Sequence, residues 1–145
     1  MEIYTIGFAK KTAAEFFGAL KQAGIKRLLD VRLHNTSQLA GFAKRDDLPF
    51  FLEALCGAEY VHEPLLAPSD ELFAAYKKAK GSWDDYARGF LELLAAREIE
   101  AKLDRKLFGR PTVLLCSEPS AEQCHRRLIV EYLQAKWGDV RAVHL

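Results

Sequence analysis

The first 32 residues carry the pattern of a strand, a helix and a second strand, and this pattern constrains the fold more than any other feature. Residues 3–6 form a short run of β-branched and aromatic side chains, and the capping box from Thr12 to Glu15 predicts a helix start. The helix is expected to end at Gly24, and residues 26–32 follow as a second strand. Because the crossover contains a helix, the two strands are expected to lie parallel.

The remaining segments extend this unit into an α/β sheet. Residues 112–116 are apolar throughout, which is typical of a central strand in a parallel sheet. Two further strands are expected, one at residues 59–62 at an edge of the sheet and one at residues 140–145. Helices are expected at 49–57, 69–81, 82 to about 97 and 120–138, the last opened by Pro119 or by a capping box from Ser120 to Gln123, and a charge-rich piece is expected at 98–107. The sequence predicts one three-layer α/β domain over residues 1–145, with a mainly parallel sheet and helices on both faces.

Residues 33–47 follow neither a helical nor a strand period. They include His34, Thr36 and Ser37, and they are expected to form a long loop with at most one helical turn. Loops of this length within a domain often carry function.

The composition excludes several classes of protein. Half of the 145 residues are hydrophobic and 28% are charged, as in an ordinary globular protein and unlike a disordered chain. No apolar run reaches the roughly 18 residues of a membrane span, and the opening residues Met1 to Tyr4 lack the pattern of a signal peptide. We therefore expect a cytoplasmic protein with no membrane partner.

The net charge of +1 conceals an uneven distribution along the chain. Residues 1–45 carry +5, residues 46–100 carry −7 and residues 101–145 carry +3. This balance excludes a general polyanion binder, but it allows a local anion site where the two basic segments meet.

The cysteine count argues against a disulfide framework. The chain holds three cysteines, which is both few and odd for such a framework. We therefore expect three reduced thiols, each of which is a core residue, a ligand or a nucleophile.

Polar residues follow three of the expected strands at the points where those strands end. Gly7 and Phe8 follow the first strand, Asp30 to Arg32 end the second, and Cys116 to Glu118 end the apolar strand. Cys124 to Arg127 then fall in the opening turns of the next helix. Ligands of open parallel sheets bind at the carboxyl ends of the strands, so we expect the functional site there.

These same segments resemble the family called domain of unknown function 488. The resemblance rests on Thr5-Ile6-Gly7, on Asp30-Val31-Arg32 with a loop that ends in Phe42, and on Leu114 to Glu118 before Cys124-His125-Arg126. Phe8 and Ala9 stand where the family has His-Ser, and His34 to Ser37 stand where it usually has a Pro. The resemblance implies an α/β fold and a site at these residues, without a reaction.

Three residues are candidates for catalysis: Glu118, Asp30 and Cys116. A carboxylate at Glu118 or Asp30 is suited to proton transfer. Asp30 is equally suited to pair with Arg32. Cys116 is either a small core residue or a nucleophile activated by Arg126 and a helix N-terminus.

We expect Cys116 to be a poorly reactive wall of the pocket. Its apolar strand neighbours raise the pKa of a thiol, and only a close Arg126 or a charged His125 would offset that effect. Five residues after Cys116 the chain has Ala121, and the arginine of a cysteine-phosphatase cradle is missing at the next position, so a phosphatase is not expected.

The remaining candidates are ligand-binding residues. The candidates are Gly7, Phe8, Arg32, Phe42, Ser117, His125 and Arg126. The arginines are suited to grip a carboxylate or phosphate. Phe8 and Phe42 are suited either to stack on a planar ligand or to fill the core, and His125 either to pack or to bind. No metal and no cofactor are expected, because Cys124 and His125 are adjacent and point apart on a helix.

The sequence favours a small enzyme that acts on a nucleotide, a nucleic-acid base or another small anionic planar ligand. The alternative is a non-catalytic module that binds such a ligand or a nucleic acid and needs only the arginines. A protein-interaction module would instead present an exposed apolar patch on the helices of the acidic middle segment.

Overall fold

The predicted strand–helix–strand unit is present at the start of the chain. The computed structural model describes residues 1–35, 41–118 and 120–145. In it, β1 (Glu2–Gly7) leads through α1 (Ala13–Gln22) to β2 (Arg27–Asp30). Thr12 caps α1 through the full capping box with Glu15.

Five strands form one parallel sheet in the order β3-β2-β4-β1-β5. The apolar strand β4 (Thr112–Cys116) lies between β1 and β2, as its composition predicts, and all five of its residues are buried. The edges are β3 (Glu59–His62) and β5 (Arg141–His144). The prediction of a mainly parallel α/β sheet is confirmed.

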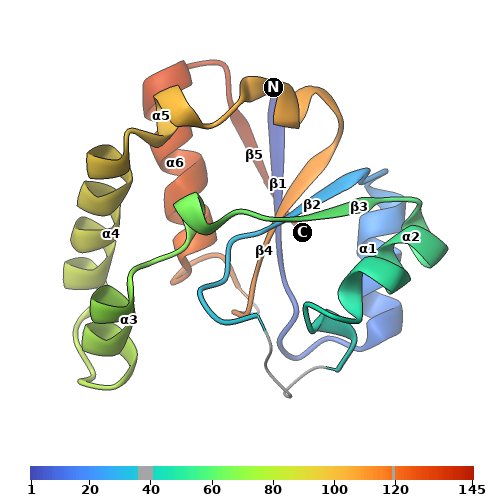
Figure 1. Cartoon of the computed structure of the whole chain (residues 1–145), viewed down its shortest axis with the longest axis horizontal. Helices are drawn as coiled ribbons and strands as arrows, with labels where there is room; N and C mark the ends of the chain where they lie inside the picture. The colour runs from blue at the N-terminus through green and yellow to red at the C-terminus, as the bar shows by residue number, and fades with distance from the viewer. Residues whose placement is uncertain (36–40, 119) are drawn as a thin grey trace.

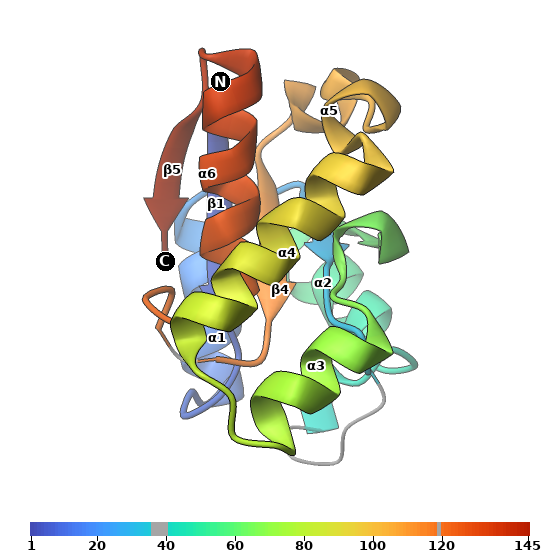
Figure 2. The same ribbon diagram turned by 90° about the vertical axis from the view of Figure 1, so that its left-hand side faces the viewer.

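Helices cover both faces of the sheet, which confirms the three-layer arrangement (Figure 1). One face packs against α1 and α2 (Leu48–Cys56). The other packs against α4 (Trp83–Arg97), α5 (Ile99–Lys102) and α6 (His125–Trp137). Figure 2 shows α4 crossing obliquely over this second layer, with α3 (Asp70–Lys77) below it.

Short 3-10 turns join these elements. They are Gly41–Ala43, Pro64–Leu66 and Arg105–Gly109. The Gly41 turn lies in the predicted 33–47 loop; Thr36, Ser37 and the rest of 36–40 lie outside the described residues. No helix in the described ranges has the length and apolar character needed to cross a bilayer.

The expected start of the last helix is wrong. Helix α6 begins at His125 with Cys124 as its N-cap, several residues after the predicted capping box. The Ser120 hydroxyl instead accepts a hydrogen bond from the Glu122 backbone N–H at 3.2 Å. This local turn competes with the helix for the same polar groups. The other predicted start, at Pro119, lies outside the described residues.

Gly7 ends β1 where the chain after β4 passes directly over it. A Cβ atom at Gly7 would lie 1.5 Å from the Glu118 carbonyl oxygen and 2.6 Å from Arg126 Nη1. Only a residue without a side chain allows this approach. Gly7 therefore sets the position of the segment that carries Glu118.

We expect Gly7→Ala to destabilise the protein by about 1–3 kcal/mol or more, because the segment around Glu118 must move to make room. Urea denaturation measures the change. Gly18→Ala is the matched control, because an added Cβ there meets nothing within 4 Å. In the middle of α1 this control is expected to stabilise by about 0.5–1 kcal/mol. Equal effects of the two substitutions would contradict the close approach at Gly7.

Candidate functional site

A small cavity lies at the carboxyl edge of the sheet, between the end of β4, the start of α6 and the helices α3 and α4. In Figure 1, α3 and the start of α4 lie at the lower left, and the end of β4 lies toward the lower centre. The cavity has a volume of about 90 Å³. Its lining residues are Phe73, Tyr76, Lys77, Tyr86, Cys116, Ser117, Glu118, Gln123, Cys124 and His125. Four of the predicted site residues, Cys116, Ser117, Glu118 and His125, are among them.

Strand alternation explains which residues reach this cavity. Successive side chains of a strand point to opposite faces. On β4, Leu114 and Cys116 belong to the core beneath α4 and α6, whereas Val113 and Leu115 belong to the core beneath α1 and α2. Cys116 is therefore directed toward α6.

Arg126 lies beneath the cavity and is almost completely buried, with a relative exposure of 1%. Its Nε donates to Thr5 Oγ1 at 3.2 Å, and its Nη1 donates to the Glu118 carbonyl oxygen at 2.6 Å and to Cys116 Sγ at 3.0 Å. Burial lowers the pKa of Arg126 to about 10. The ion pairs found in the described part of the chain do not include Arg126, so no carboxylate balances its charge directly.

Cys116 and Cys124 are joined by a disulfide, and Cys56 is free. The expectation of three reduced thiols is therefore wrong for two of them. The Cα atoms of the pair are 7.6 Å apart, slightly more than the usual maximum of about 7 Å. Cys124 lies at the N-cap of α6 and not within the helix, where it was expected.

The low reactivity expected of Cys116 does not hold, because a cation lies next to its sulfur. That expectation required the absence of a close cation, and Arg126 Nη1 lies 3.0 Å from its sulfur. A guanidinium at this distance stabilises a thiolate and favours its formation once the disulfide is reduced.

His125 is held as a neutral ring. Its Nε2 lies 2.7 Å from the Val31 carbonyl oxygen and must donate to it, and its ring meets the edge of Phe90 at a centroid distance of 5.4 Å. Burial, together with Arg126, lowers the pKa of His125 to about 4. With Nε2 protonated, Nδ1 is left as an acceptor and lies 3.9 Å from Cys124 Sγ.

Glu118 and Lys77 form an ion pair at the cavity, with Glu118 Oε1 2.8 Å from Lys77 Nζ. Their side chains are 40% and 44% exposed. An exposed pair of this kind contributes about 0–1 kcal/mol, so a ligand can separate it at little cost. The Lys77 Nζ also lies 5.1 Å from the ring centroid of Tyr76.

The structure does not bring Asp30 and Arg32 to the cavity. Both are buried and form a two-point ion pair, with Arg32 Nε and Nη2 each 2.8 Å from a different Asp30 oxygen. Asp30 Oδ2 also accepts from the Tyr60 hydroxyl at 2.6 Å, and Arg32 Nη2 donates to the Ala43 carbonyl oxygen at 2.7 Å. This network agrees with the structural interpretation of Asp30, because both carboxylate oxygens already accept hydrogen bonds. Arg32 Nη1 is buried without a hydrogen-bond partner among the described residues.

The predicted aromatic ligands also lie away from the cavity. Phe8 is buried, with the Arg32 guanidinium 5.4 Å from its ring centroid. Phe42 packs against Phe16 and Phe17 at centroid distances of 5.3 and 5.7 Å. Both belong to the core beneath α1 and α2, as the packing interpretation of these residues expected.

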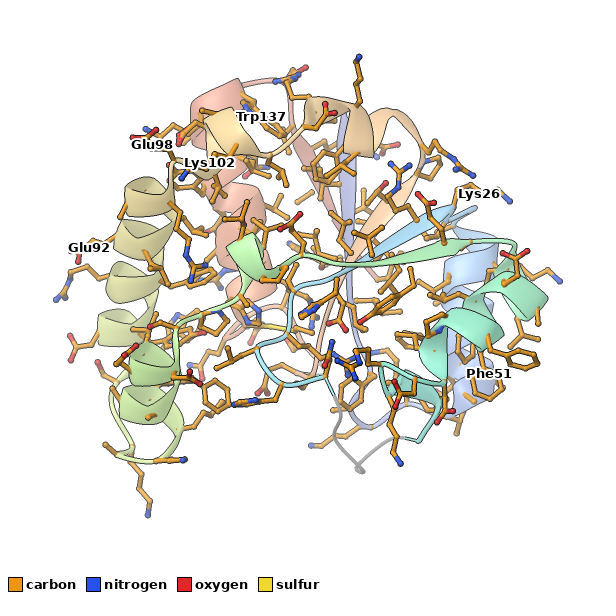
Figure 3. The ribbon with its side chains drawn as sticks, in the orientation of Figure 1. Lys26, Phe51, Glu92, Glu98, Lys102 and Trp137 are labelled. Atoms are coloured by element: carbon orange, nitrogen blue, oxygen red, sulfur yellow. A yellow bond between two sulfur atoms is a disulfide. The ribbon has the colours of Figure 1, made fainter. Side chains whose placement is uncertain are left out.

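An apolar groove lies on that opposite layer. Its volume is about 320 Å³, and its lining residues are Ala13, Ala14, Phe17, Gly18, Lys21, Phe42, Phe51 and Leu55. Figure 3 shows Phe51 of α2 on the side of the molecule that carries α1. Phe50 and Leu55 are the large hydrophobic side chains exposed in the described residues, at 68% and 48%. The patch expected of a protein-interaction module was placed on the helices of the acidic middle segment, and only Phe51 and Leu55 of the groove lining come from that segment.

Sequence reasoning missed the helical wall of the cavity. Phe73, Tyr76 and Lys77 come from α3, and Tyr86 comes from α4. No local motif marks these residues. The available signal was the aromatic spacing of Tyr76, Trp83 and Tyr86, which pack together with Tyr76 and Tyr86 at a centroid distance of 4.6 Å.

Among the described residues, His, Cys, Asp and Glu side chains form no cluster of three or more suited to a metal ion. The expectation that the chain needs no cofactor remains a prediction.

The fold and the cavity define a small three-layer α/β protein with a site at the carboxyl edge of a parallel sheet. The family described as "Domain of unknown function DUF488" matches residues 12–133 of the 145-residue chain, and the chain belongs to that family. The comparison with curated proteins and the comparison with solved structures gave no match.

We expect Asp30→Asn to destabilise the protein by about 3–5 kcal/mol, because it leaves the buried Arg32 without a counter-charge. Chemical denaturation measures the change. Asp46→Asn is the control, because Asp46 forms an exposed ion pair with Arg45 and is expected to change stability by at most about 1 kcal/mol. Similar losses for the two variants would contradict the role of the buried pair.

Acid is expected to destabilise the fold partly through His125. The folded protein takes up this proton near pH 4, whereas the unfolded chain takes it up near the ordinary value of 6.5. The unfolded state therefore binds more protons between these values, and stability falls as the pH decreases through this window, by at most about 3 kcal/mol for this group. Denaturation curves at pH 7 and pH 4.5 should show a smaller loss for His125→Gln than for the wild type. An identical loss would show that His125 is not protonated on unfolding.

Proposed function

We propose that the protein is a small cytoplasmic enzyme that acts on a nucleotide, a nucleic-acid base or another small anionic planar ligand held in the cavity at the carboxyl edge. The observation that carries the proposal is the combination of aromatic walls, a cation and a carboxylate around one small cavity. Each part corresponds to one property of the ligand or of its reaction.

The aromatic wall supports a planar ligand. Tyr76 and Tyr86 both line the cavity, and they pack on each other at a centroid distance of 4.6 Å, so a ligand would meet the parts of the two rings that face the cavity. Flat aromatic surfaces bind planar groups by stacking, with about 1–3 kcal/mol for a base.

The cations support an anionic ligand. Lys77 lines the cavity, and the buried Arg126 lies beneath it. The amino end of α6 adds a partial positive charge, because Cys124 forms no side-chain cap there. A further cation, Lys11, lies near Arg126. Burial lowers the pKa of Lys11, and the charge of Arg126 lowers it further.

The size of the cavity limits what it encloses. Sites that bury a whole drug-sized molecule measure about 300–1,000 Å³, and this cavity measures about 90 Å³. It is suited to a small molecule or to one end of a larger molecule, such as the base or phosphate of a nucleotide whose remainder stays in solvent.

Glu118 is the residue that we assign to proton transfer. It lies at the cavity, remains partly exposed to solvent and is held in place by Lys77. A carboxylate in this position takes a proton from the bound ligand or returns one to it. When a ligand anion binds Lys77, Glu118 is released from its ion pair and becomes available for this step.

Binding can be tested with a panel of nucleobases, nucleosides, nucleoside monophosphates and small aromatic carboxylates. We expect at least one anionic member to raise the melting temperature and to bind in native mass spectrometry. Lys77→Ala should weaken that ligand about tenfold, or about 1.4 kcal/mol. Lys78→Ala, next along the chain and not part of the cavity lining, should leave it unchanged. A panel without any binder, or equal losses in both variants, would refute the proposed site.

Turnover is tested separately with the ligand that binds most tightly. Glu118→Gln should retain affinity within about threefold while product formation, followed by mass spectrometry, decreases by about 10²–10⁴-fold. Glu122→Gln is the control from the same segment. Binding without any product in the wild type would favour the alternative, a non-catalytic binding module.

A further inference from the structure

The inner end of the cavity holds two sulfurs and a guanidinium to which the proposed function gives no chemical step. Cys116 and Cys124 lie on the cavity wall, and Arg126 Nη1 contacts both sulfurs, at 3.0 and 3.9 Å. The two cysteines come from the end of β4 and from the N-cap of α6. The arrangement brings together one buried cation and two cysteine sulfurs, which are joined as a disulfide in this structure.

The charge of Arg126 favours a thiolate at one of these sulfurs, that of Cys116. A buried cation is costly unless an anion balances it, and the ion pairs of the described residues leave Arg126 out. The closest group that can become an anion is Cys116 Sγ. The Glu118 carboxylate acts on Arg126 from a greater distance and raises its pKa, which only partly offsets burial. On reduction of the disulfide, a thiolate at Cys116 is the anion in direct contact with the guanidinium.

The two sulfurs are not equivalent. Cys124 lies farther from the guanidinium, and its sulfur is 3.9 Å from His125 Nδ1, a hydrogen-bond acceptor. The reduced Cys124 is therefore held as a protonated thiol that donates to His125. The geometry assigns nucleophilic attack to Cys116 and the second, resolving step to Cys124.

Access to the pair is restricted to small molecules. Cys116 is 1% exposed and Cys124 is 3% exposed. A cavity of about 90 Å³ leads to them, which admits a molecule the size of hydrogen peroxide and excludes a protein disulfide.

We propose that Cys116 and Cys124 form a reversible redox pair, in which the Cys116 thiolate reduces a small hydroperoxide and Cys124 resolves the product into the disulfide. Disulfides in cytoplasmic proteins are usually transient and take part in catalysis or redox sensing. The disulfide in this structure represents the oxidised state of the pair.

The chemistry balances in three steps. The Cys116 thiolate attacks one oxygen of the hydroperoxide; an S–O bond forms, the O–O bond breaks, and the leaving oxygen takes a proton from water, which gives a sulfenic acid and an alcohol or water. The Cys124 thiol then attacks that sulfur; the S–S bond forms and the hydroxyl leaves as water with the Cys124 proton. A small dithiol returns both cysteines to thiols and becomes a disulfide itself.

Cys56 provides an internal reference within the same molecule. It is free and only partly buried, and burial raises the pKa of its thiol. It is more exposed than Cys116, and the charges of Lys21 and Lys26 only partly offset the effect of burial on its pKa. The hydrogen bond of its sulfur in the described residues goes to the Phe17 carbonyl oxygen at 3.7 Å, whereas the Cys116 sulfur accepts from a guanidinium. Because Cys56 is the more accessible thiol, a faster reaction at Cys116 cannot result from better access and indicates activation by Arg126.

The test starts from protein reduced with dithiothreitol and freed of it. Hydrogen peroxide is added at pH 7, samples are quenched with N-ethylmaleimide, and peptide mass spectrometry follows each cysteine. We expect Cys116 to be oxidised at least tenfold faster than Cys56 and to appear as a disulfide with Cys124. In Cys124→Ser, dimedone added together with urea, which opens the buried site, should trap a sulfenic acid at Cys116, and Cys56→Ser should react at the wild-type rate.

Arg126→Lys keeps the positive charge, but the single amine of lysine cannot contact both Thr5 Oγ1 and Cys116 Sγ as Nε and Nη1 of Arg126 do. We expect oxidation of Cys116 to slow about tenfold or more. Because this variant perturbs a buried residue, its fold is checked by circular dichroism, and the comparison with Cys56 in the wild type stands without it. Oxidation of Cys116 no faster than Cys56, or a disulfide that excess dithiothreitol does not cleave in the folded protein, would overturn the proposal. The second result would make the bond a permanent structural crosslink.

Discussion

The buried guanidinium of Arg126 organises the carboxyl edge of the sheet. It joins α6 to β1 and to the end of β4, because it donates to Thr5, to Cys116 and to the backbone carbonyl of Glu118 just after that strand. It reaches these partners only because Gly7 lacks a side chain where the Glu118 segment crosses β1. The shape of the cavity and the chemistry of its sulfurs both follow from this one buried cation.

The architecture was predictable because its signals are local. The capping box at Thr12 and the apolar run of β4 specify the strand–helix–strand unit and the central strand without any knowledge of distant contacts. The start of α6 was mispredicted for a local reason too, since Ser120 used its hydroxyl in a turn and left Cys124 as the N-cap. The disulfide was not expected because three cysteines are few and odd in number for a disulfide framework, and that count does not exclude a single pair.

The candidate site was predictable only in part, because it depends on which face of the sheet each side chain meets. Cys116 and Asp30 both lie at strand ends, yet Cys116 faces α6, while Asp30 bonds to Tyr60 and Arg32. Alternation along the strands contained this information. The wall formed by Tyr76 and Lys77 depends on how α3 packs in three dimensions, and no sequence pattern specifies that packing.

The end of β2 is gripped from both sides of the sheet. On one side the Asp30 carboxylate accepts hydrogen bonds from Arg32 and from the Tyr60 hydroxyl. On the other side the Val31 carbonyl oxygen accepts a hydrogen bond from His125 Nε2. Two adjacent residues therefore make polar contacts on opposite faces of the sheet. Because His125 lines the cavity, any change in the core beneath α1 and α2 that moves the end of β2 also moves the cavity wall next to the sulfurs.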